Sequence, residues 1–175
     1  HRDSFTVDMD ASAADKGAYP FYMLKEIDEQ PAVMRKLVQE YFGDNDVAQI
    51  NEEMLKDMAN ADHLYIVGAG TSYHAGLVGA RIFEKLCGIQ TEVDIASEFR
   101  YRNPIIDDKT LCIFISQSGE TADTIAALKL SREKGAKTLA ISNVIGSSIT
   151  READYSIYTH AGPEIAVAST KAYTS

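Results

Sequence analysis

From residue 63 onwards, short apolar runs alternate with stretches of helical periodicity. Nearly every residue within a run is apolar, which is typical of strands buried on both faces. Between the runs, apolar residues recur every three or four positions, the spacing of one helix face. The pattern predicts strands at residues 63–67, 90–94, 111–115, 138–142 and 155–158. It predicts helices at residues 72–87, 96–101, 119–134 and 147–153.

This alternation predicts an α/β fold, because parallel strands are joined by crossover helices that cover both faces of their sheet. We expect a three-layer α/β/α, flavodoxin-like domain whose five parallel strands are ordered 2-1-3-4-5. Gly88 and Gly135 lie just past two expected helix ends, where a left-handed residue often closes a helix.

A polar arm and a helical prefix precede the first strand. Residues 1–20 lack apolar periodicity and are expected to be a linker from a preceding domain, as either a mobile end or an ordered arm. A helix is expected over residues 21–30, a second one starting at Pro31, and a third over 46–58. The division is therefore a linker at 1–20 and one domain at 21–175, with a helical prefix at 21–60 and an α/β core at 61–175. The helical pattern that starts at residue 166 stops abruptly, so we expect more chain in the parent protein.

Composition narrows the class of partner. The 175-residue chain carries a formal net charge of −9, which disfavours nucleic-acid binding because phosphate backbones attract basic surfaces. No apolar run approaches membrane-spanning length, and the first residues lack a signal-peptide pattern, so no membrane partner is expected. Cys87 and Cys112 are both expected to be core thiols of a reducing compartment, which favours the cytoplasm.

A hydroxyl-rich turn follows the third predicted strand. Ser116, Gln117, Ser118, Gly119 and Thr121 lead from an apolar run directly into a helix. A helix start presents unpaired N–H groups with partial positive charge, and the hydroxyls add further donors. The turn therefore predicts a phosphate site without a basic residue. The alternative is a simple helix cap, but one hydroxyl would suffice for that.

A second loop of the same design follows the first predicted strand, where Gly68-Ala69-Gly70 leads to Thr71 and Ser72. A dinucleotide site would need a third glycine at position 73, which is Tyr73, and a P-loop lysine is absent. Strands 1 and 3 are neighbours in the expected order, and the chain winds away from them in opposite directions. Both hydroxyl loops should therefore flank one crevice at the carboxyl ends of these strands.

Other reactive residues give weaker signals. The four histidines show no metal-ligand spacing, and only His74, beside the second loop, has some claim to a functional role. Ser116 and Ser118 lack the glycine elbow of a serine nucleophile, so hydrogen bonding to phosphate is the better interpretation. A third polar turn runs from Glu164 to Lys171, where a helix cap and a functional role are equally open.

Four segments together resemble a sugar isomerase (SIS) domain, most closely the first SIS domain of the glucosamine-6-phosphate synthase family, the glutamine:fructose-6-phosphate aminotransferases. The segments are residues 70–72, 97–102, 116–124 and 164–172, and residues 22–31 also resemble the stretch before the isomerase half of those enzymes. The resemblance implies a sugar-phosphate site and no metal or organic cofactor. It implies that phosphate is held by Ser116, Gln117, Ser118 and Thr121, that Thr71 and Ser72 lie at the same site, and that Val167 and Ser169 contact the sugar.

The resemblance also sets limits. The glutaminase domain, the second SIS domain and the C-terminal tail of such enzymes, with their catalytic groups, have no match in this sequence. We therefore assign no catalytic residue here and expect a homodimeric, substrate-binding fragment of an aminotransferase that makes glucosamine 6-phosphate from fructose 6-phosphate and glutamine. The alternative is a non-catalytic sugar-phosphate sensor in a regulator. A regulator should carry a DNA-binding helix pair in its prefix, whereas the helices here are acidic.

Overall fold

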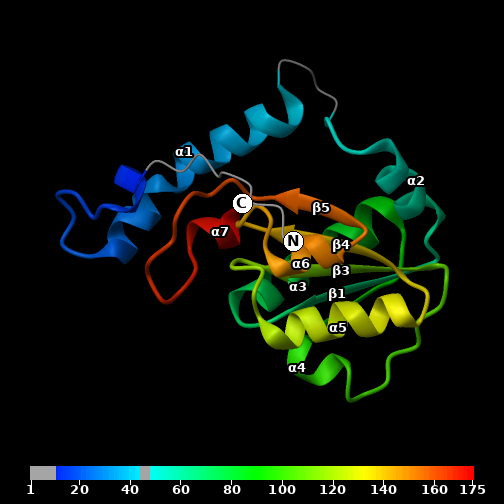
Figure 1. Ribbon diagram of the computed structural model, residues 1–175. Coiled ribbons are helices and arrows are strands. Elements are labelled where there is room, and N and C mark those ends of the chain that lie inside the picture. Colours follow the sequence, from blue (N-terminus) through cyan, green and yellow to red (C-terminus); the bar gives the residue numbers. More distant parts are fainter. Residues whose placement is uncertain (1–10, 44–47) are drawn as a thin grey trace, which may run out of the picture.

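The computed structural model describes residues 11–43 and 48–175 (Figure 1). Its five strands form one parallel sheet in the order β2-β1-β3-β4-β5, which confirms the predicted fold class and strand order. The strands are β1 (His63–Gly68), β2 (Thr91–Ile95), β3 (Thr110–Ser116), β4 (Lys137–Ser142) and β5 (Tyr155–Tyr158).

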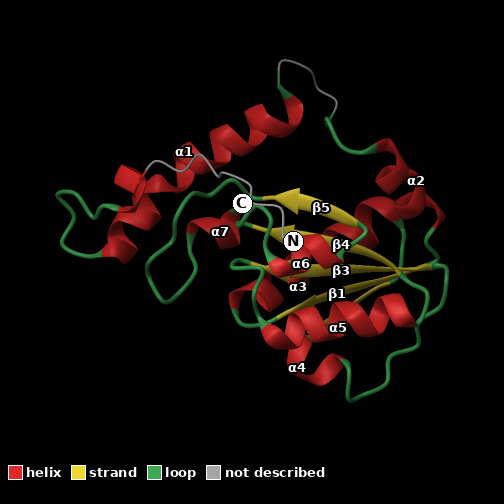
Figure 2. Ribbon diagram, viewed as in Figure 1, coloured by secondary structure: helices red, strands yellow, loops and turns green. Residues whose placement is uncertain are grey.

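Helices cover both faces of the sheet (Figure 2). Successive residues of β1 point to opposite faces, so Leu64 and Ile66 pack with Met54 in one buried cluster, and Tyr65 and Val67 belong to another. The first cluster lies under α2 (Glu52–Asn60) and α3 (Thr71–Cys87), and the second lies under α4 (Ala96–Phe99), α5 (Ala122–Glu133) and α6 (Ser148–Glu152).

Helix α3 lies close to the sheet because Gly76 faces it. A Cβ at Gly76 would lie 2.9 Å from Cγ2 of Ile66 and 3.1 Å from Cγ1 of Val93. The missing side chain therefore sets how near the start of α3 approaches β1 and β2.

The prediction that a new helix starts at Pro31 is wrong. A single helix, α1 (Tyr22–Phe42), passes through Pro31. Proline has no N–H for the carbonyl four residues earlier, which is that of Ile27. The side chain of Gln30 replaces the missing donor, because its Nε2 donates to the Ile27 oxygen at 3.1 Å.

The third prefix helix starts later than predicted. Helix α2 begins at Glu52, because the Oδ1 atom of Asn51 accepts a hydrogen bond from Met54 N at 3.0 Å and so caps it. The first residues of the predicted range, 46 and 47, lie outside the described residues. Tyrosines tie both prefix helices to β5: Tyr155 donates to Asp57 of α2 at 2.6 Å, and Tyr41 of α1 donates to the Tyr158 carbonyl at 2.8 Å.

Two further expectations need correction. Cys87 is exposed rather than a core thiol, because it lines an open hollow beside Leu64 and Phe83, whereas Cys112 is buried in β3 as expected. The final helix, α7 (Lys171–Thr174), begins five residues after the predicted start at residue 166. Of the expected N-terminal arm, a short 3-10 helix, η1 (Ala11–Ala14), is described, and residues 1–10 lie outside the described part.

Candidate functional site

A cavity of about 380 Å³ opens at the carboxyl ends of β1 and β3, where the sequence places the crevice. All eight residues singled out as a sugar-phosphate site line it, and they come from three separate loops. They are Thr71, Ser72, Ser116, Gln117, Ser118, Thr121, Val167 and Ser169.

The turn after β3 is braced by its own serines. Oγ of Ser116 accepts a hydrogen bond from Gly119 N at 3.1 Å and lies 3.4 Å from Oγ1 of Thr121. Oγ of Ser118 accepts from Glu120 N at 3.2 Å. A hydroxyl that accepts one hydrogen bond keeps its own hydrogen, so Ser118 still has a donor for an anion in the cavity.

These hydroxyls do not cap α5, which removes the simplest alternative for the turn. The two N–H groups that bond to Ser116 and Ser118 belong to Gly119 and Glu120, before the helix starts at Ala122. Thr121 is the N-cap residue, and its side chain makes no capping hydrogen bond among the described residues. The first-turn N–H groups of α5 are therefore left for another acceptor, beside the cavity.

The turn is also fixed to the start of α6. The Gly119 carbonyl accepts from Ile149 N at 3.0 Å, and the Glu120 carboxylate accepts from Ser148 N at 2.7 Å. This bond from the Ser148 N–H holds the pKa of Glu120 below its ordinary value. Glu120 is thus used to hold the turn, and it does not line the cavity.

The glycines of the loop after β1 serve its tight turn. A Cβ at Gly68 would lie 3.0–3.1 Å from atoms of Ser72 and Tyr73, and Gly70 has a φ of +59° as N-cap of α3. These glycines bring Thr71 and Ser72 back over the end of β1. The turn geometry therefore accounts for both glycines, without a role in binding a nucleotide.

The third segment is the loop before α7, which brings Val167 and Ser169 to the cavity. Ser169 donates to the Glu164 carboxylate at 2.9 Å, and the other carboxylate oxygen accepts from Thr170 N at 2.7 Å. Glu164 therefore braces this turn, as expected of the helix cap that was one of the two interpretations of the segment.

The cavity has no ionisable lining among the described residues. Its polar groups are hydroxyls, the Gln117 amide and backbone groups, so it can hold an anion by hydrogen bonds and has no group there to move a proton. Thr124 also lines it and was missed from the sequence; its buried hydroxyl has no partner among the described residues. Its place one helical turn beyond Thr121 was the available signal.

The other reactive residues lie elsewhere. His74 is exposed and stacks edge-on against Tyr73 with ring centroids 5.6 Å apart, and it does not line the cavity. Burial raises the pKa of the Cys112 thiol to about 12, which makes it unreactive.

The described residues contain no group of three side chains placed to hold a metal ion. None of their helices has both the length and the apolar character needed to cross a membrane.

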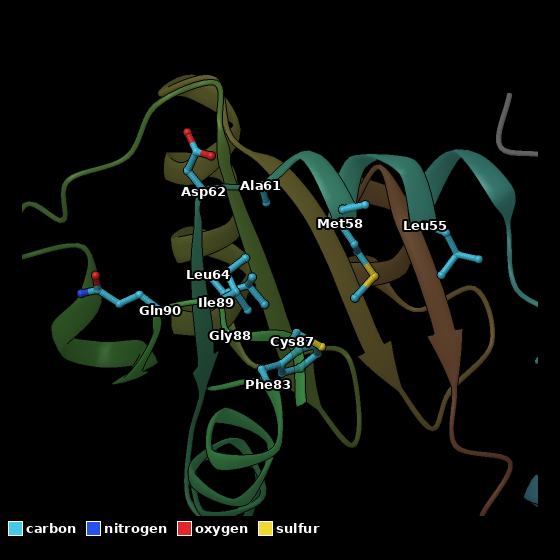
Figure 3. Close-up of a pocket in the computed structure, with 11 residues that line it drawn as sticks. Leu55, Met58, Ala61, Asp62, Leu64, Phe83, Cys87, Gly88, Ile89 and Gln90 are labelled. Atoms are coloured by element: carbon cyan, nitrogen blue, oxygen red, sulfur yellow. The ribbon is translucent and has the colours of Figure 1, made fainter. Parts of the chain in front are cut away.

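A larger hollow of about 710 Å³ lies at the opposite end of the sheet (Figure 3). It is lined mainly by apolar side chains of α2 and the end of α3, including Leu55, Met58 and Phe83. Leu64 and Gln90 place it at the amino ends of β1 and β2, away from the three loops. Substrate sites of such sheets lie at the carboxyl ends, so the smaller polar cavity is the candidate site.

Comparison with known proteins gives consistent matches. Residues 57–175 match the SIS domain family. Over 174 residues, 99% of this chain, it is 56% identical to "Glutamine--fructose-6-phosphate aminotransferase [isomerizing]" of Staphylococcus epidermidis and 55% identical to the protein of the same name from Oceanobacillus iheyensis. The chain spans 29% of the length of these relatives.

A solved structure agrees. The C-terminal domain of glucosamine-fructose-6-phosphate aminotransferase from Francisella tularensis superposes with a TM-score of 0.86 at 40% sequence identity. The match covers 91% of this chain and 45% of that one.

Proposed function

The chain belongs to the SIS domain family, and from this premise we propose that its cavity binds a sugar phosphate. The observation that carries the proposal is the convergence of hydroxyls from three loops on one cavity, beside two helix starts that no side chain caps among the described residues. The N-cap residue of α3 is a glycine, Gly70, and the Thr121 side chain makes no capping bond to α5. A phosphate ester needs several convergent donors, and helix N-termini supply them. The uncharged lining explains how an acidic protein can still hold an anion.

We further propose that the chain is the substrate-binding part of a glutamine–fructose-6-phosphate aminotransferase, because relatives of that name are 54–56% identical over almost the whole chain. In this proposal one loop holds the phosphate, a second closes the same site and a third contacts the sugar. The phosphate-binding loop carries Ser116, Gln117, Ser118 and Thr121. The second loop carries Thr71 and Ser72, and the third carries Val167 and Ser169. The match includes the helical prefix, which favours the enzyme over a regulator.

Titration of the chain with glucosamine 6-phosphate and with glucosamine tests the binding proposal. Amide signals of the turn after β3 should shift with the phosphorylated sugar and stay in place with the free sugar, because the turn supplies donors to the phosphate. Equal binding of the two sugars would contradict it.

We expect the chain alone to make no glucosamine 6-phosphate from fructose 6-phosphate, with either glutamine or ammonia. The described cavity lining has no ionisable side chain, and positioned acids and bases typically contribute about 10² to 10⁴ in rate. A product assay by mass spectrometry checks this. Formation above the rate without protein would show that the chain carries its own catalytic groups.

We also propose a cytoplasmic homodimer. The outer faces of two helices expose apolar side chains, including Ile27, Met34 and Val38 of α1 and Val78 and Ile82 of α3, each 37–55% exposed. Apolar stripes of this kind favour burial against a partner, and two-fold dimers are the commonest soluble assembly. Sedimentation at micromolar concentration should show a dimer, and monomer alone would count against it.

A further inference from the structure

The loop that brings Val167 to the cavity has little packing of its own. Residues 161–170, between β5 and α7, form no helix or strand, and Val167 is fully exposed at the tip. A loop of this kind would sample many conformations unless other parts of the molecule held it. Asn143 binds its first residues, Ala161 and Gly162, and charged side chains that the proposed site does not use hold the rest.

Glu26 of α1 binds the backbone of this loop directly. Its Oε1 atom accepts hydrogen bonds from Ile165 N at 2.6 Å and Ala166 N at 3.0 Å, although the loop lies about 140 positions later in the sequence. Only 2% of Glu26 is exposed. A buried carboxylate that accepts two backbone N–H groups forms strong, directional bonds, so it fixes the peptide just before Val167.

A second charged contact holds the far end of the loop. Lys171, the first residue of α7, is 2% exposed, and its Nζ lies 2.6 Å from the Glu29 carboxylate on α1. Glu29 also pairs with Lys25 at 3.1 Å. Burial would raise the pKa of Glu29, but the two lysines outweigh it and hold that pKa below its ordinary value. Glu29 therefore stays charged near neutral pH and keeps its partner in place.

The loop is thus pinned on both sides of the residues that reach the cavity. Glu26 holds residues 165 and 166, the Lys171–Glu29 pair holds the start of α7, and Glu164 braces the turn between them. Glu26 and Glu29 project from one helix, three residues apart, so they share a face.

Resting on the proposed sugar-phosphate site, we propose that Glu26 is a positioning residue that holds the Val167–Ser169 segment for the sugar, with the Glu29–Lys171 pair as the second anchor. The phosphate turn, residues 116–121, belongs to another element and is braced by its own serines and by the start of α6. Loss of Glu26 should therefore weaken recognition of the sugar and leave recognition of phosphate intact. A role confined to stability would change both together.

The experiment compares Glu26→Ala with the unaltered chain by NMR, using glucosamine 6-phosphate and inorganic phosphate as probes. In Glu26→Ala the Kd for glucosamine 6-phosphate should rise about tenfold, because two charge-assisted hydrogen bonds that order the loop are lost. The Kd for inorganic phosphate should stay within about twofold. Amide hydrogen exchange at Ile165 and Ala166 should speed up at least about tenfold.

Two further variants complete the design. Glu40→Ala removes an exposed glutamate from the same helix and should behave as the unaltered chain does. Glu26→Gln keeps an acceptor oxygen without the charge, so its exchange rates at Ile165 and Ala166 should lie between those of the unaltered chain and Glu26→Ala. If Glu26→Ala does not fold, Glu26→Gln carries the same comparison.

Unchanged exchange at Ile165 and Ala166, unchanged binding of glucosamine 6-phosphate, or equal loss of both probes would overturn the inference. Failure of the unaltered chain to bind glucosamine 6-phosphate would instead contradict the proposed function, and with it the sugar-positioning role of Glu26. The exchange rates would still show whether Glu26 anchors the loop.

Discussion

Gly119→Ala is expected to lower the free energy of unfolding by roughly 2–4 kcal/mol and to abolish measurable sugar-phosphate binding. Gly119 has a φ of +67°, which strains any residue with a Cβ. The new Cβ would also overlap Ser147, whose own Cβ would be 2.5 Å away, and would lie 2.9 Å from Oγ of Ser142. The turn must therefore move out of the position in which its donors converge. Thermal denaturation should show a fall of roughly 5–15 °C in Tm.

The matched control is Gly88→Ala. Gly88 has nearly the same φ, +66°, but a Cβ there would meet no atom within 4 Å. The control should show only the strain of the left-handed conformation, about 1–2 kcal/mol, with unchanged ligand binding. Equal destabilisation by the two substitutions would show that the close approach of Gly119 to the β4–α6 loop does not affect the free energy of unfolding.

Ser118→Ala is expected to weaken binding of glucosamine 6-phosphate roughly 10- to 100-fold. A hydrogen bond to a charged group contributes about 1.5–3 kcal/mol, and the Ser118 hydroxyl lines the cavity with its hydrogen still available. In the free protein the hydroxyl accepts one bond, from Glu120 N at 3.2 Å at the half-exposed rim. Loss of that bond should therefore cost less than about 1 kcal/mol of stability. Calorimetric titration measures the first effect, and thermal denaturation measures the second.

Ser156→Ala is the control, because it removes the same hydroxyl from the exposed edge strand β5 and should leave binding unchanged. Binding by Ser118→Ala that matches the unaltered chain would reduce the role of that serine to bracing its own turn.

The apolar runs determined most of the fold. Every predicted strand is present within one residue of its expected ends, because strands buried on both faces leave an unbroken apolar signal. The neighbouring positions of β1 and β3 followed from the doubly wound order, so the sequence alone could place two of the three site loops at one crevice.

The wrong predictions lie where a long-range contact or a side-chain contact overrides a local sequence preference. Proline is expected to begin a helix, yet α1 continues through Pro31 because Gln30 satisfies the Ile27 carbonyl. A cysteine in an apolar helical segment is expected to be buried, yet Cys87 is exposed because α2 and the end of α3 leave an open hollow beside it.

The sequence by itself determined which residues could hold a phosphate, because hydroxyls and glycines at strand-to-helix turns form a local pattern. It left the roles of Glu164 and Lys171 open and gave no sign of Glu26, because a charged residue on a helix usually faces water. Glu164 braces its own turn through local contacts with Ser169 and Thr170. Only the tertiary structure decided the roles of Lys171 and Glu26. It brings α1 against a loop about 140 positions away, where the buried Glu26 carboxylate accepts backbone N–H groups and the half-buried Glu29 carboxylate pairs with the buried Lys171. Such contacts depend on how separate elements dock, and no local spacing in the chain encodes that.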